Sequence, residues 1–265
     1  MKVTFEECKR ALVNPSESKA QRALREWRNR SGYEKVVDWV MDFEHDYLFQ
    51  ITIPNLRQVQ KDSEHALGDV QSQEQMPEVE DFTCPFALEH LFHMYVERFK
   101  ELPTWQRWWN WLWEEGAPGF IDPVKRYLGW SRAGRQQRRI FNRAIRWRLG
   151  KFYYSAFREV EFLTRMREEY GVYLSYHVLA DVLLRADFWS GNVVLCTYFP
   201  NPRYRTGSGG RKPEAEKFLG DANPPFTIMN VEVERQGQGT FWTLSEDSLG
   251  RVASQIERTM ESTGM

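Results

Sequence analysis

Residues 183–199, LLRADFWSGNVVLCTYF, decide the fold that this chain of 265 residues is predicted to adopt. Two apolar runs flank the pair Gly191-Asn192, and such a pair between β-forming residues is a strong hairpin motif. The first run also carries Asp187, and an ionised carboxylate among apolar neighbours is costly without a partner. The stretch therefore predicts a β-hairpin with an acid in its first strand.

The segments around this hairpin predict an α+β or α/β core. Residues 152–170 and the segment that Ser245 caps have helical periodicity. Residues 172–189 and 226–235 are rich in β-forming residues, and the second of these is predicted to pair with 240–244 across a glycine-rich turn. The predicted core is a small mixed β-sheet flanked by helices and preceded by a helical N-terminal region.

The first part of the chain is predicted to be mainly helical. Residues 16–49 carry two apolar stripes that are typical of a helical hairpin, and residues 85–102 have one broad apolar face. Residues 51–53 precede a proline and are predicted to form an edge strand. Residues 57–81 are polar and acidic, which predicts a long surface loop.

Composition bounds the class of protein. With 42% hydrophobic and 15% aromatic residues the chain can fill a core, and its net charge of -1 excludes a uniformly basic nucleic-acid binder. The three cysteines have no CxxC spacing, so neither a disulfide framework nor a zinc ribbon is indicated. No apolar run reaches the roughly 18 residues of a membrane span, so a cytoplasmic protein with no membrane association is expected. Two parts are predicted, a helical region at 1–125 and a basic helix with the α/β core at 126–265.

The clearest charge feature is the stretch from Lys125 to Lys151, which contains ten basic residues and no acid. A helix from about residue 134 would turn an apolar stripe that includes Ile140 inward and place arginines on another face. Two alternatives stay open: acids elsewhere, such as those of residues 62–81, neutralise this face, or it binds a nucleic acid or an acidic protein. Arginine favours bidentate contact with phosphates, so nucleic acid is the favoured partner. The predicted nucleic-acid-binding residues are Arg132, Arg135, Arg138, Arg139, Arg143, Arg146, Arg203, Arg205 and Lys212.

Residues 105–113 contain five tryptophans, most of them at helical spacing. A tryptophan stripe of this kind is more often part of a core than a platform for stacking bases, so a core position is favoured. Trp111 lies roughly opposite the stripe and is predicted to be the most exposed of the five.

The histidines and cysteines give only weak indications of a metal site or a catalytic nucleophile. His90 and His93 are predicted to be structural, because no second pair of zinc ligands follows them. Cys196 with His177 is a reserve hypothesis for nucleophilic chemistry, since no oxyanion-hole motif accompanies them.

A helix with an inward Glu159, a strand with Asp187 and a short turn into an apolar strand resemble the core of PD-(D/E)XK nucleases. Helical geometry puts Glu159 at the edge of the buried face and Glu161 on the solvent side. The resemblance covers residues 152–260 and implies a restriction-endonuclease-like fold with Glu159 and Asp187 as catalytic, Mg²⁺-binding residues. Where that family has a second acid and a lysine, this chain has Cys196 and Tyr198, which supply neither a hard oxygen ligand nor a positive charge.

The resemblance therefore implies a degenerate nuclease-like core without a cofactor, of the kind found in mobile-element and phage-defence machinery. The leading hypothesis is a nucleic-acid-associated protein that binds DNA or RNA backbone through its arginine-rich helix. One alternative is a structural subunit that docks an acidic protein. Another is an active, Mg²⁺-dependent nuclease with an atypical acid set. For Asp187, a structural ion pair with Arg185 or another arginine is an equally open interpretation.

Overall fold

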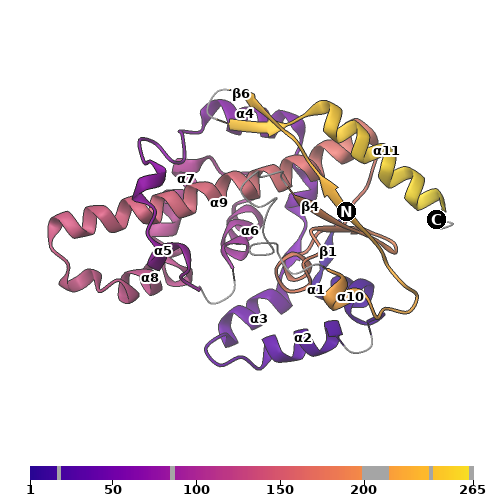
Figure 1. Ribbon diagram of the computed structural model, residues 1–265, viewed down its shortest axis with the longest axis horizontal. Helices are drawn as coiled ribbons and strands as arrows, with labels where there is room; N and C mark the ends of the chain where they lie inside the picture. The colour runs from indigo at the N-terminus through magenta and orange to yellow at the C-terminus, as the bar shows by residue number, and fades with distance from the viewer. Residues whose placement is uncertain (17–18, 84–86, 199–214, 239–240, 263–265) are drawn as a thin grey trace.

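The helix α9 (Arg135–Tyr170) runs along the molecule, and the other elements pack around it (Figure 1). The computed structural model describes residues 1–16, 19–83, 87–198, 215–238 and 241–262. With 36 residues, α9 is about 54 Å long at 1.5 Å per residue. Its buried face runs from Phe141 to Met166.

The sequence predicts two helices where α9 is continuous. No proline interrupts this helix. Gly150 lies against the segment that contains Leu67, and a Cβ at this position would come within 2.8 Å of the Leu67 side chain. The predicted inward position of Ile140 is wrong, since this side chain is 42% exposed. The first turns of α9 therefore extend past the core.

The predicted hairpin is confirmed. Strand β3 (Phe188–Ser190) pairs with β4 (Val193–Tyr198) in antiparallel register, with Ser190 opposite Val193. The two-residue turn between them needs a positive φ at Gly191, which is 54°. The predicted pairing of residues 226–235 with 240–244 is wrong for most of that segment, because β5 (Thr227–Glu232) pairs in parallel with β4 instead.

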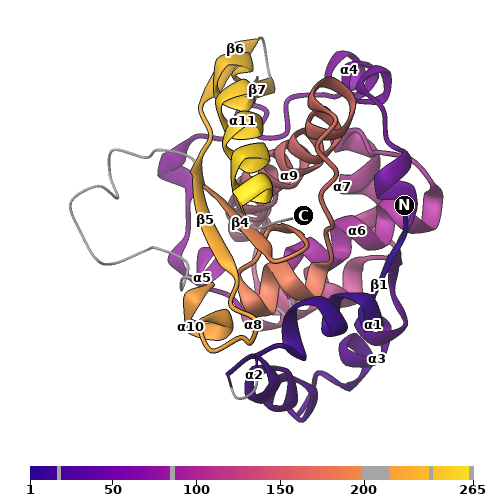
Figure 2. The same ribbon diagram turned by 90° about the vertical axis from the view of Figure 1, so that its right-hand side faces the viewer.

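A separate two-stranded sheet completes the C-terminal part. It consists of β6 (Arg235–Gln238) and β7 (Phe241–Leu244), which pair in antiparallel fashion. The short helix α10 (Glu216–Leu219) precedes β5, and the predicted final helix is α11 (Glu246–Ser262). Figure 2 shows β4 and β5 side by side, and α11 contacts both α9 and β4.

Residues 172–184 do not form the predicted strands. An isolated bridge joins Ser175 to Trp189, and the chain then makes a single π-helical turn, Ala180–Leu184. This turn buries Ala180 and Leu184 completely. Burial of these side chains therefore decides the local conformation over their β-propensity.

The N-terminal helical hairpin is confirmed as α2 (Lys19–Arg28) and α3 (Glu34–Asp42). The helix α1 (Phe5–Cys8) and a π-helical turn, Lys9–Val13, precede it. Strand β1 (Val3–Thr4) pairs with β2 (Glu44–His45), and a short 3-10 helix, Tyr47–Gln50, follows β2.

The predicted edge strand at residues 51–53 is wrong. Instead, α4 (Ile53–Asp62) begins there, because Thr52 and Asn55 form a capping box and Pro54 is tolerated in a first helical turn. The predicted loop at 57–81 is also wrong in part. It contains the end of α4, a 3-10 helix and α5 (Pro77–Glu80), and these elements contact α9.

The remaining helices build the centre and the outer end of the molecule. They are α6 (Leu88–Phe99), α7 (Trp105–Trp113), a 3-10 turn at Ala117–Gly119, α8 (Ile121–Tyr127) and a 3-10 turn at Trp130–Arg132. The boundary predicted between residues 125 and 126 falls inside α8, and buried side chains from both sides of it join one core.

The tryptophan stripe is a core element, as the sequence predicts. Trp105 and Trp108 pack against Tyr153 of α9, with ring centroids 5.6 and 5.9 Å apart. Trp111 is only 5% exposed, so its predicted exposure is wrong. It packs against Tyr95 of α6, and a Cβ at Gly116 would come within 2.8 Å of its ring.

The fold class is α+β, as predicted. A mostly helical chain carries a small mixed sheet and a two-stranded sheet. The restriction-endonuclease-like arrangement stays a prediction. Among the described helices, none combines the length and the apolar character needed to cross a membrane.

Candidate nucleic-acid interface

The inner arginines of α9 bind the acidic segment that precedes them in the sequence. Arg143 Nη1 lies 3.0 Å from Asp69 Oδ2, and two further nitrogens of Arg143 donate to the Glu74 carboxylate. This contact lowers the pKa of Glu74 to about 2, mainly through the hydrogen bond from Arg143. Neutralisation by residues 62–81, one of the two alternatives, is therefore realised at this position.

Arg146 and Arg148 hold backbone carbonyls of the same segment. Arg146 Nε donates to Ala66 O at 2.9 Å, and Arg148 Nη1 donates to Phe82 O at 2.7 Å. The guanidinium groups of Arg143 and Arg146 thus donate hydrogen bonds to groups of the protein itself. These contacts fix the segment against α9, and the prediction that Arg143 and Arg146 bind nucleic acid stays a prediction.

The outer cations form what we call the basic end, at the N-terminus of α9 and the adjoining α8 (Figure 1). Most of them are exposed, and Arg138 donates to the carbonyls of Trp130 and Ser131 at 3.2 Å. Within the described chain, no ion pair reaches Arg126, Arg132, Arg135 or Arg139. The basic end comprises Lys125, Arg126, Arg132, Arg135, Arg138 and Arg139.

The predicted basic loop cannot be placed beside these residues. Arg203, Arg205 and Lys212 lie outside the residues that the structure describes. The candidate interface is therefore built from α8, α9 and the turn between them.

Asp187 is buried, as the apolar sequence around it predicts, and it is satisfied locally. Its carboxylate accepts hydrogen bonds from the Thr197 backbone N–H at 2.6 Å and from the Thr197 hydroxyl at 2.8 Å. Thr197 lies on β4, so this contact ties the beginning of β3 to its partner strand. Sequence reasoning missed Thr197, although it is the residue between Cys196 and Tyr198.

Glu159 lies half-buried on α9, far from the basic end. It is 20 residues after Arg139, which corresponds to about 30 Å along a helix. The pKa of buried Tyr176 is raised mainly by its burial. The negative charges of nearby acids, among them Glu159 and Asp187, raise it further. The two predicted acids thus share one buried region, but the arginines of the basic end do not line it.

Glu161 lies in a position that the helical periodicity does not predict. It is 3% exposed, and its Oε1 accepts from the Leu244 backbone N–H at 3.4 Å. Burial raises its pKa to about 7. The prediction of a solvent position is wrong because β7 covers this side of α9.

The other residues that the sequence singled out form hydrogen bonds within the protein or are buried in it. Cys196 Sγ donates to Arg185 O at 3.3 Å, and Tyr198 donates to Glu232 at 3.3 Å. His90 and His93 are buried, and burial lowers their pKa values to about 4 and about 3. Within the part of the chain that the structure describes, no group of three or more His, Cys, Asp or Glu residues is placed to hold a metal ion.

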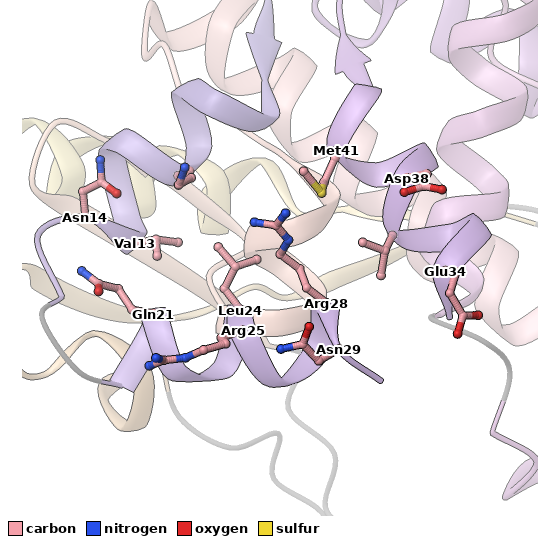
Figure 3. Close-up of a pocket in the computed structure, with 12 residues that line it drawn as sticks. Val13, Asn14, Gln21, Leu24, Arg25, Arg28, Asn29, Glu34, Asp38 and Met41 are labelled. Carbon is pink, nitrogen blue, oxygen red and sulfur yellow. The ribbon is translucent and has the colours of Figure 1, made fainter. Parts of the chain in front are cut away.

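Two hollows lie outside the predicted acid site. One has a volume of about 360 Å³ and lies between α7, α9 and residues 69–70. The other, of about 700 Å³, lies between α2, α3 and the turn Lys9–Val13, and Figure 3 shows Arg28 reaching into it from α2. Because Glu34 and Asp38 also line this second hollow, its charge is mixed and does not favour an anionic ligand.

Comparisons with known proteins found no relative of this chain. Models of protein families, curated protein sequences and solved structures all gave no match for the chain.

Proposed function

We propose that this protein binds the phosphate backbone of a nucleic acid through its basic end. One observation carries the proposal: six cations gather on α8, α9 and the turn between them, in a stretch that contains no acid. Four of them lack an ion pair among the described residues. Like charges this close repel each other unless an anion lies against them.

Two further features add to the attraction. The N-cap Gly134 gives α9 no side-chain cap, so the positive end of the helix dipole faces the same region. The guanidinium groups of Arg132, Arg135 and Arg139 are exposed, and each can form bidentate hydrogen bonds with a phosphate. The ion pairs between the basic stretch and acids lie further along α9, at Arg143 and Lys151, although Glu74 also attracts Arg139 electrostatically.

A binding assay with a matched control tests the proposal. We expect the full chain to bind fluorescent DNA or RNA strands at low salt, and the variant R132Q/R135Q/R139Q to bind much more weakly. The control R10Q/R25Q/R28Q removes three exposed arginines from the N-terminal helices, for which the described residues show no ion pair. The control should bind like the wild type. Absence of binding at low salt by the wild-type chain would refute the proposal.

A second candidate function is docking of an acidic protein. Tyr127 and Ile140 flank the basic end and are 62% and 42% exposed. Aromatic and arginine side chains together are enriched at protein interfaces. If an acidic protein is the partner, the triple variant loses that protein in a pull-down, while nucleic-acid binding is absent in the wild type.

A further inference from the structure

The smaller hollow lies directly beside the basic end. It is lined by Trp109 and Trp113 of α7 and by Asn142, Arg143 and Arg146 of α9. Asp69 and Val70 complete the lining. Its volume of about 360 Å³ is near the lower end of the roughly 300–1,000 Å³ that small-ligand sites occupy.

The two tryptophans differ from the other three of α7. Trp105, Trp108 and Trp111 are buried, whereas Trp109 and Trp113 are half-exposed. Their ring centroids are 5.4 Å apart, and Lys125 Nζ lies over the Trp113 ring, 4.1 Å from its centre, so this cation covers one face of Trp113. A half-exposed tryptophan such as Trp109, with a cation nearby, suits a flat ring that carries a phosphate.

The two arginines of α9 that line the hollow are held in place. Arg143 is fixed by Asp69 and Glu74, and Arg146 by the carbonyls of His65 and Ala66. Asn142 is exposed between them and is free to use its amide donor and acceptor. The hollow therefore needs little reorganisation to accept a ligand.

A single face of α9 connects the hollow to the basic end. Arg135, Arg139, Asn142 and Arg146 follow one another at steps of four, three and four residues. Residues at these steps lie on one face of a helix. An anionic chain on Arg135 and Arg139 would thus lead to Asn142 and the hollow that Trp109 lines.

We propose that this hollow receives one unpaired base of a single-stranded nucleic acid, whose backbone lies along Arg135 and Arg139. The inference rests on the proposed function and makes its substrate class specific. A base inside a duplex is stacked on both sides and cannot enter, whereas an unpaired base can stack on an aromatic side chain. An acidic peptide is less favoured, since Asp69 and Glu74 already neutralise Arg143.

An abasic strand separates this inference from the proposed function. We measure the affinity of a short oligothymidylate, a strand of equal length and charge without bases, and a duplex. Stacking of one base predicts that the abasic strand binds roughly 5- to 150-fold more weakly than the oligothymidylate. Equal affinities for the two strands would overturn the base site and leave backbone binding intact. No binding of any strand would overturn both.

Two variants locate the site. Trp109→Ala should remove the preference for the oligothymidylate over the abasic strand, and Asn142→Asp, an exposed change that spares the core, should reduce it. Trp147→Ala is the matched control, because Trp147 is a half-buried tryptophan of α9 outside this hollow. Retention of the preference in both test variants would overturn the inference. Binding of polyglutamate that is lost in Trp109→Ala would also overturn it, in favour of a peptide site.

Discussion

Replacing Glu161 by glutamine should make the protein more stable at neutral and alkaline pH. Glu161 is 3% exposed, and within the described chain its Oε2 has no hydrogen-bond partner. Its nearest cation, Arg165, is 3.8 Å away and also binds Glu169 at 2.8 Å. The charged form is thus poorly compensated, and burial raises the pKa of Glu161 from 4.5 to about 7.

The sign and size of the effect follow from this shift. A carboxyl whose pKa is raised on folding contributes its full stability below about pH 4.5, and the contribution is lost as the pH rises through 7. Between pH 5 and pH 8 the wild type should lose about 2 to 3 kcal/mol through this group. Glutamine carries no charge and can still accept from Leu244 N–H, so the variant should not show this loss.

Urea unfolding at pH 5 and pH 8 measures the effect. We expect Glu161→Gln to exceed the wild type by about 2 to 3 kcal/mol at pH 8 and by less than about 1 kcal/mol at pH 5. Glu169→Gln is the control, because Glu169 is exposed on the same helix and shares Arg165. A difference between Glu161→Gln and wild type that does not change with pH would refute the reasoning.

Three further predictions concern other buried groups. Burial lowers the pKa of His90 to about 4, so its contribution to stability is complete above pH 6.5 and is lost as the pH falls toward 4. In urea unfolding, His90→Gln should therefore reduce the loss of stability between pH 7 and pH 5 by about 2 kcal/mol. Thr197→Val removes one of the two hydrogen bonds that described residues donate to the Asp187 carboxylate and should cost about 1.5 to 3 kcal/mol; a neutral effect would show that the remaining contacts are sufficient. In Mg²⁺ or Mn²⁺ the wild type is expected to leave nucleic acid intact, and cleavage that Asp187→Ala abolishes would instead identify an active nuclease.

Local motifs made part of this fold predictable. The pair Gly191-Asn192 predicts the hairpin because the turn chemistry depends only on neighbouring residues. The helical spacing of Trp105 and Trp108 predicts their place in the core. The α+β class follows from such local elements.

Contacts between distant segments were not predictable. Glu161 is buried because β7 covers it, and Trp111 is buried because Tyr95 packs against it; neither partner is near in sequence. The parallel pairing of β5 with β4 likewise depends on a long connection. A single helical periodicity cannot describe α9, because other elements cover it on more than one side.

The candidate site was predictable only in part. The basic stretch 125–151 correctly indicates where cations gather, but charge alone does not show which of them acids neutralise. Arg143 pairs with Asp69 and Glu74, more than 60 residues earlier, and no local pattern reveals this. Within the described part of α9, the basic-stretch arginines for which no ion pair is found lie mainly in its first turns.

The salt dependence of nucleic-acid binding tests the central claim most directly. For single strands, each neutralised phosphate contributes about 0.7 to the slope of log K against log salt concentration. Removal of Arg132, Arg135 and Arg139 together should therefore reduce that slope by about 2. The R10Q/R25Q/R28Q control, two of whose positions line the larger hollow, should keep the wild-type slope. An unchanged slope in R132Q/R135Q/R139Q, or a reduced slope in the control, would contradict the assignment of the basic end as the interface.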